Sequence, residues 1–135
     1  MDDTLGTLAR ADAVRLKAFA ETLIGDFGDV EVLQSRSGLV MLPMRDTAGG
    51  VAFHLGEALM SEAHIRMSGM DGYGMRRGHD LEAAMAMALV DLALVADVRA
   101  ADCAAFCARE AQALAAQDDD TLRRVEATRV NMETF

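Results

Sequence analysis

The sequence is poor in cysteine, proline and aromatic residues. Its 135 residues include two cysteines, one proline, one tyrosine and no tryptophan. Two cysteines do not make a disulfide framework, so a fold that depends on disulfides is excluded. Hydrophobic residues make up 52% of the chain, which excludes a disordered protein. A single domain over residues 1–135 is expected, because one core commonly serves about 100 to 200 residues.

Basic residues and long apolar runs are also scarce. The chain has 13 lysines and arginines against 22 aspartates and glutamates, a net charge of −9. Electrostatic attraction to nucleic acid or to an anionic membrane is therefore disfavoured. No run approaches the roughly 18 apolar residues of a membrane span, and the acidic start MDDTLGTLARAD is unlike a signal peptide. We expect a cytoplasmic protein without nucleic-acid or membrane partners.

The middle of the chain is predicted to form a β-sheet. Alternating or continuous apolar residues predict strands near 30–35 and 38–44, with a hairpin turn at Ser37 and Gly38. Turn residues follow from Asp46 to Gly50, and residues 51–68 predict one or two further strands.

Helices are predicted on both sides of this sheet. Leucine spacing predicts two helices or one kinked helix over residues 5–25, with Asp12 as a cap. Residues 80–96 are apolar on nearly all sides, which predicts a central buried helix. An alanine-rich helix to about residue 116 and a last helix, capped at Asp120 or Thr121, complete the chain. This order predicts an α+β fold, an antiparallel sheet of about four to five strands flanked by N-terminal and C-terminal helices.

A glycine-rich stretch before the central helix is the first candidate binding site. Residues 69–78 contain four glycines, which let a backbone approach an anion, and a helix N-terminus follows. The candidate ligand-binding side chains are Arg76, Arg77 and His79. The stretch matches neither known phosphate-loop pattern, and Asp80 puts a negative charge where a phosphate would lie. A hairpin turn followed by a helix cap is the alternative interpretation.

Histidines and cysteines are the second candidate for chemistry. His54, His64 and His79 would form a metal site only if the sheet brought them together, and their spacing does not require it. Cys103 and Cys107 share one helical face, which suits a redox pair, but packing as small apolar residues is the favoured interpretation. The sequence shows no recognisable nucleophile and base pair, so catalytic residues stay unassigned and no metal is expected.

Several short motifs, in order along nearly the whole chain, resemble the G subunit of carbon–phosphorus lyase, the PhnG family. They are Ser37-Gly-Leu-Val40, Leu55-Gly-Glu57, Ser61 with Ala63–Arg66, Gly72-Tyr-Gly74, Gly78–Asp91 and ATRVN from Ala127. Some positions depart from the family pattern. His79 replaces the usual arginine, Met85 replaces a glutamate, and Ser61-Glu62 replaces a threonine and an arginine.

The resemblance implies a non-autonomous subunit of a complex with I-, H- and J-type subunits. In that family the G subunit supports transfer of an alkylphosphonate to the ribose C1 of ATP, with release of adenine. ATP would be a substrate of the complex, and no cofactor is expected in this chain. Two alternatives are a free-standing homo-oligomeric binding module for a small anionic ligand and a thiol or metal enzyme. The ten methionines agree with an apolar surface that meets another subunit.

The C-terminal end is predicted to be a partner interface. The interface residues would be Arg129, Val130, Asn131, Met132 and Phe135. Large apolar side chains at an unrestrained chain end seldom belong to a small domain's own core. In the resembling family this end is rich in phenylalanine, as an interface anchor would be. A frayed terminus is the alternative.

Overall fold

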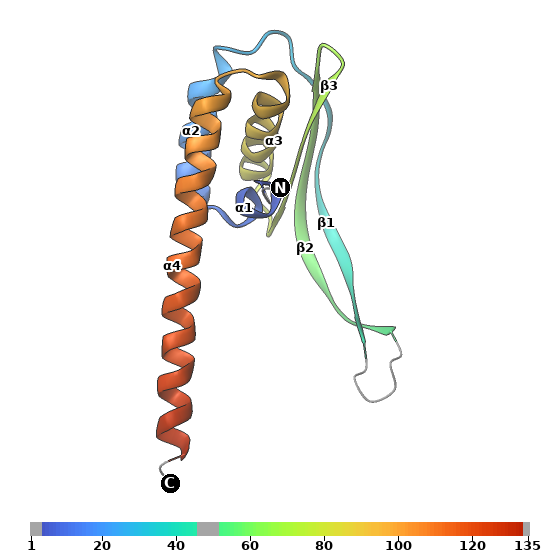
Figure 1. Cartoon of the computed structure of the whole chain (residues 1–135). Coiled ribbons are helices and arrows are strands. Elements are labelled where there is room, and N and C mark those ends of the chain that lie inside the picture. The colour runs from blue at the N-terminus through green and yellow to red at the C-terminus, as the bar shows by residue number, and fades with distance from the viewer. Residues whose placement is uncertain (1–3, 46–51, 134–135) are drawn as a thin grey trace.

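The computed structural model describes residues 4–45 and 52–133 of the chain, and it describes side chains within 4–40 and 57–127. Four helices and three strands follow one another in these residues (Figure 1). They are α1 (Thr4–Arg10), α2 (Ala13–Ile24), β1 (Glu31–Arg45), β2 (Ala52–Met67), β3 (Met70–Arg77), α3 (Leu81–Ala96) and α4 (Ala100–Glu133). The α+β class is confirmed.

The sheet is antiparallel with the order β1-β2-β3. β3 pairs only with residues Met60–Met67 of β2, whereas β1 pairs with β2 down to Arg45 and Ala52. The farther part of β1 and β2 is therefore a two-stranded ribbon. Figure 1 shows this ribbon and the end of α4 extending in the same direction past the body of the protein.

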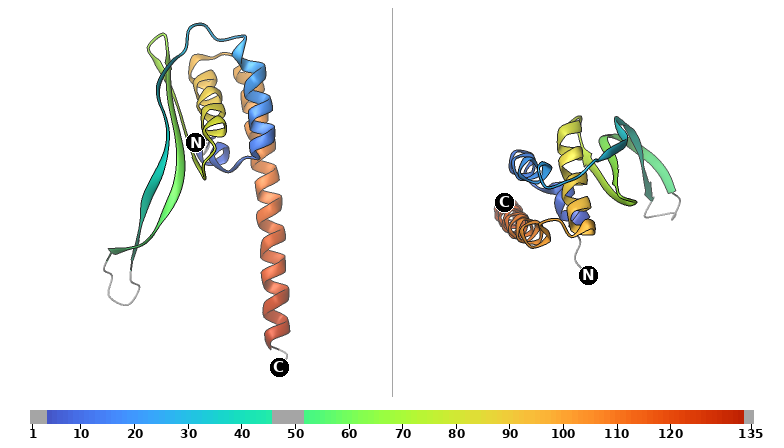
Figure 2. Two further views of the ribbon diagram at one scale, coloured as in Figure 1. Left: turned by 180° about the vertical axis from the view of Figure 1, so that it is seen from behind. Right: turned by 90° about the horizontal axis from the view of Figure 1, so that it is seen from above.

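Helix α3 is the centre of the structure, as predicted for residues 80–96. Its apolar surface is continuous around the helix, so it has a packing partner on two sides. One side contacts Ala63 and Ile65 of the sheet, and the other contacts Leu16 of α2 and Phe106 of α4. Figure 2 shows α3 between the sheet and the other helices.

Two glycines of β3 allow α3 to lie directly on the sheet. A Cβ atom at Gly72 would collide with the Ala88 carbonyl oxygen, and one at Gly74 would collide with the Ala84 carbonyl oxygen. These glycines therefore serve close helix–sheet packing. The hairpin turn considered for residues 69–78 is confined to Ser68 and Gly69, because residues 70–77 form a strand, and the helix cap considered with it is present at Asp80.

Among the described residues, the sheet has three strands rather than the four to five expected. The predicted hairpin at Ser37 and Gly38 was wrong, because both residues lie inside the continuous strand β1. Gly38 pairs with Met60, and the antiparallel partners β1 and β2 flank residues 46–51, which lie outside the described residues. Gly38, a glycine inside a strand, was thus interpreted as a turn residue.

The last helix is also continuous. The predicted interruption near residues 117–121 was wrong, because α4 runs for 34 residues. Asp119 and Asp120 stay exposed and gain partners within the helix, because Asp119 pairs with Arg123 and Asp120 with Arg124, both at 2.9 Å. Ion pairs spaced i,i+4 stabilise a helix, so α4 continues through a segment whose residues have a low helix propensity.

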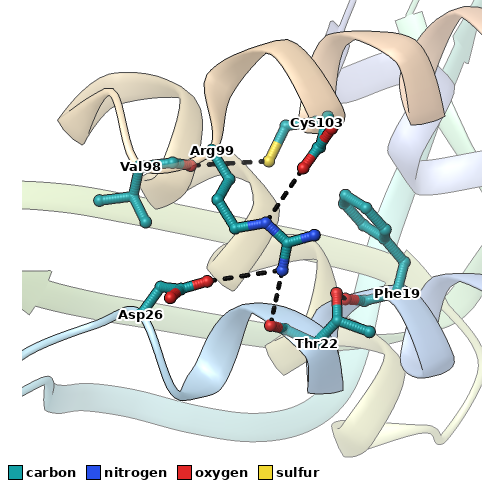
Figure 3. Close-up of polar contacts among 7 residues, drawn as sticks. Phe19, Thr22, Asp26, Val98, Arg99 and Cys103 are labelled. Carbon is teal, nitrogen blue, oxygen red and sulfur yellow. Dashed lines mark hydrogen bonds and ion pairs between the residues drawn. The ribbon is translucent and has the colours of Figure 1, made fainter.

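The two N-terminal helices confirm the prediction for residues 5–25. The side chain of Asp12 accepts a hydrogen bond from the backbone N–H of Arg15 at 3.0 Å and caps α2. The other end of α2 is tied to the start of α4 by Arg99, whose guanidinium donates to the Thr22 carbonyl oxygen at 2.8 Å and contacts Asp26 (Figure 3). These contacts hold the helices in one layer.

Candidate functional site

The junction of β3 and α3 carries the residues predicted to bind an anion. Asp80 caps α3, since its carboxylate accepts from the Ala83 N–H at 3.1 Å and pairs with Lys17 at 2.9 Å. Both contacts lower the pKa of Asp80, that of Lys17 more strongly. Ser61, fully buried, donates to the Gly78 carbonyl oxygen at 2.7 Å and accepts from the Asp80 N–H at 2.9 Å. The Ser61 hydroxyl and the N–H groups of Asp80 and Ala83 at the start of α3 therefore have hydrogen-bond partners within the protein.

Arg76 points from β3 toward the helices. Its guanidinium donates to the carbonyl oxygen of Leu8, and to that of Ala11 at 2.7 Å. Burial lowers the pKa of this guanidinium. Carbonyl groups at the end of a short helix need such donors. Arg76 therefore fixes the connection between α1 and α2, and its replacement would affect stability, contrary to the expectation for a free anion-binding side chain.

Arg77 and His79 lie elsewhere on the junction. Arg77 is exposed beside a surface hollow of about 520 Å³ that Glu57 and Leu59 also line. His79 is exposed, and its Nδ1 lies 2.7 Å from the Ser37 hydroxyl of β1. Arg76, Arg77 and His79 thus point to different surroundings. An anion-binding role for them stays a prediction.

The sheet face opposite α3 carries a polar cluster that the sequence analysis did not single out. Glu62 accepts from the Tyr73 hydroxyl at 2.5 Å and from Arg36 at 2.8 Å. Asp71 accepts from Arg66 at 2.6 Å and lies 3.1 Å from His64 Nε2. The alternation of Glu62, His64 and Arg66 with buried Ala63 and Ile65 along β2 was the available signal.

Protonation in this cluster follows from the contacts. The hydrogen bond from Tyr73, and then that from Arg36, lowers the pKa of Glu62. Desolvation and the Glu62 carboxylate raise the pKa of Tyr73 to about 12. The hydrogen bonds from Arg66 and His64 lower the pKa of Asp71 to about 2. Around neutral pH the cluster thus holds ionised carboxylates, each paired with an arginine, and no carboxyl group poised as a proton donor.

The candidate metal site is not assembled in the described residues, and the two cysteines pack in or against the core. His64 lies with Asp71 and His79 with Ser37, while the side chain of His54 lies outside the described residues. Within the described parts of the chain, no three His, Cys, Asp or Glu residues cluster to hold a metal. Cys103 is buried in the core, and desolvation raises its thiol pKa to about 11. Its Sγ faces the Val98 carbonyl oxygen (Figure 3), which confirms its packing in the core.

The far half of α4 presents an exposed apolar stripe. Leu114 lines a hollow beside α1, where Arg10 pairs with Asp118 at 2.9 Å. The same helix face continues through Leu122 and Val125, whose side chains are 63% and 58% exposed. The side chains of Arg129, Val130, Asn131 and Met132, and all of Phe135, lie outside the described residues. Their interface role stays a prediction.

The fold and these surfaces define a small α+β protein with exposed apolar and polar surfaces. No helix of the described chain is long and apolar enough to cross a membrane. The sequence model of the family described as "Phosphonate metabolism protein PhnG" matches residues 2–135. A relative from Rhizobium meliloti (strain 1021), "Alpha-D-ribose 1-methylphosphonate 5-triphosphate synthase subunit PhnG", is 31% identical over 98% of this chain and 92% of its own length. The chain belongs to the PhnG family of phosphonate metabolism proteins, as its resemblance indicated.

Proposed function

We propose that the chain is a non-catalytic subunit of an alpha-D-ribose 1-methylphosphonate 5-triphosphate synthase, the transferase part of a carbon–phosphorus lyase complex. The complex would transfer an alkylphosphonate to the ribose C1 of ATP and release adenine. ATP would be its substrate, and I-, H- and J-type subunits would be the partners of this chain. The single observation that carries the proposal is the 31% identity, over 98% of the chain, to a subunit with that name.

The structure supports a role in assembly rather than in bond breaking. Buried Ser61 at the β3–α3 junction is hydrogen-bonded to the backbone of Gly78 and Asp80. In the polar cluster on the sheet face opposite α3, Glu62 and Asp71 are each paired with an arginine. By contrast, Leu122 and Val125 are exposed on a helix that extends beyond the body. Large apolar side chains in such a position stabilise a complex when a partner covers them.

Deletion of Asn131–Phe135 tests the role of the C-terminal end. The truncated chain is expected to keep the melting temperature of the full chain, because these residues follow the contacts of α4 with the body. Its affinity for the I-type subunit should fall by about 2 kcal/mol or more if Phe135 is an anchor. Calorimetry on the purified subunits measures the loss, and the full chain carrying Glu126→Gln is a control for a change on the same helix.

Unchanged affinity after the deletion would contradict the predicted interface. A large fall in melting temperature would show instead that the end folds onto its own domain. If neither the full chain nor the truncated chain bound any partner subunit, and the full chain formed homo-oligomers that bind a small anion, the free-standing module would be the correct function.

A further inference from the structure

The two edges of the sheet differ in how their backbone groups are satisfied. At the β3 edge, the Tyr73 N–H donates to Asp91 of α3 at 2.9 Å. The strand order puts β1 at the other edge, and α3 packs mainly on β3 and β2. The β1–β2 register runs without a shift from Gln34 to Leu42, so this part of the edge is regular and long enough to pair with another strand.

The orientation of the edge groups follows from one hydrogen bond. The Gly78 N–H donates to the Leu59 carbonyl oxygen at 2.7 Å, so the backbone groups of Leu59 point toward β3. In an antiparallel pair, the backbone groups of successive residues point alternately toward the partner strand and away from it. Two residues directly opposite each other either both point toward each other or both point away. Leu59 lies opposite Leu39. The N–H and C=O groups of Leu39, and by alternation those of Ser37 and Ser35, therefore point to the open side of β1.

From Gln34 to Leu42, between the two register shifts of β1, the edge lacks several features that usually protect an edge. Between Val32 and Leu42 the strand contains no proline and no lysine. Its one charged residue there, Arg36, is held on the outer face by Glu62. An open, regular edge of this kind is a template for a further strand.

An apolar groove lies beside this edge on the helix side of the sheet. It has a volume of about 320 Å³, and it opens between α2, α3 and Ser35 of β1. Its apolar lining includes Ala20, Ile24, Met85 and Leu89, and Ile24 is 57% exposed. Three charged side chains also line it: Lys17, Glu21 and Glu82. A strand added beside β1 would lie about 4.8 Å from it and would direct alternate side chains to this side of the sheet.

We propose that β1 accepts a fourth strand from a partner subunit, an extended segment with apolar residues at alternate positions that fill the groove between α2 and α3. The proposal rests on the proposed function, because it requires a partner subunit. A second copy of the chain is a poorer occupant. Each copy carries a net charge of −9, so two copies repel each other.

Amide hydrogen exchange at single residues tests the pairing. In the isolated chain the amides of Ser35, Ser37 and Leu39 should exchange fast, whereas those of Arg36 and Gly38 should be protected by β2. In the complex co-purified with the H-, I- and J-type subunits, the first three should slow by at least about tenfold. Arg36 and Gly38 are the internal control, because β2 protects their amides in both states.

A pair of variants tests whether the backbone donor carries the binding. Leu39→Pro removes the outward N–H, whereas Leu39→Ala removes the same apolar side chain and keeps the N–H. The proline variant should keep the melting temperature of the alanine variant and bind the partner subunits at least about tenfold more weakly.

Each outcome decides between the occupants. A complex that forms while Ser35, Ser37 and Leu39 stay fast would overturn the fourth strand and leave the proposed function intact. Failure of any complex to form would overturn both. Protection that appears in the isolated chain and rises with its concentration would show that a second copy occupies the edge, which would overturn the partner strand.

Discussion

Replacing Gly74 by alanine is expected to lower the free energy of unfolding by about 3 kcal/mol, the upper end of the usual cost of overpacking a core. The added methyl group would meet the Ala84 carbonyl oxygen, the Ala88 backbone nitrogen and the Cβ of Met87. These atoms belong to a central helix packed on both sides, so they cannot move away cheaply. Urea unfolding of the two proteins measures the difference.

Gly38→Ala is the matched control for this experiment. It adds the same methyl group to a strand glycine, but nothing lies within 4 Å of that position. The stability of this variant should stay within about 0.5 kcal/mol of the parent protein. If both variants lost the same stability, the close approach of α3 to β3 would not be the reason for the glycines.

Removing the Glu110 side chain is expected to cost about 2 kcal/mol of stability. Glu110 of α4 is only 4% exposed. It accepts from Arg15 Nε at 2.8 Å and from the Asp12 backbone N–H at 3.3 Å, so it joins α4 to the start of α2. Thermal unfolding of Glu110→Ala measures the loss, and Asp119→Ala, which removes an exposed pair on the same helix, should change stability by at most about 0.5 kcal/mol.

The contribution of Glu110 also depends on pH. The hydrogen bond from Arg15, followed by smaller contributions that include the Asp12 N–H, lowers its pKa in the folded protein below its usual value. A carboxyl group with a lowered folded-state pKa stabilises the fold above its unfolded pKa of about 4.3, and this stabilisation disappears as the pH falls through the folded-state value. The difference in melting temperature between the parent protein and Glu110→Gln should be full at pH 6 to 7 and should shrink below about pH 4. A difference that stays constant down to pH 3 would contradict this assignment.

The helices were largely predictable because their signals are local. Asp12 and Asp80 are capping residues directly before apolar stretches, and the structure has both caps. The nearly uniform apolar surface of residues 81–96 required burial on all sides, which only a central position provides. The sequence therefore predicted the helix that organises the core.

The errors arose where a local signal was overruled by packing or pairing. Gly72 and Gly74 are typical of a loop by themselves, yet β3 needs glycine because α3 lies directly on it. Gly38 indicated a turn, but pairing with β2 kept the strand extended. The acidic residues 118–120 indicated a helix start, but ion pairs with Arg10, Arg123 and Arg124 kept α4 continuous.

The site was less predictable than the fold for a similar reason. Arg76 and Arg77 are neighbours in sequence, but a strand sends neighbouring side chains to opposite faces. Only Arg76 reaches the carbonyl groups of Leu8 and Ala11, at and just after the end of α1. The partners of Glu62 and Asp71 lie on other strands or across a turn, so only the register reveals them.

Adenine release from ATP and methylphosphonate is the measurement that tests the central claim most directly. The purified chain alone should release no adenine. Under the proposed function, the other subunits of the transferase should release adenine only when this chain is added. Appreciable release by this chain alone, or full release by the other subunits without it, would contradict a required non-catalytic subunit.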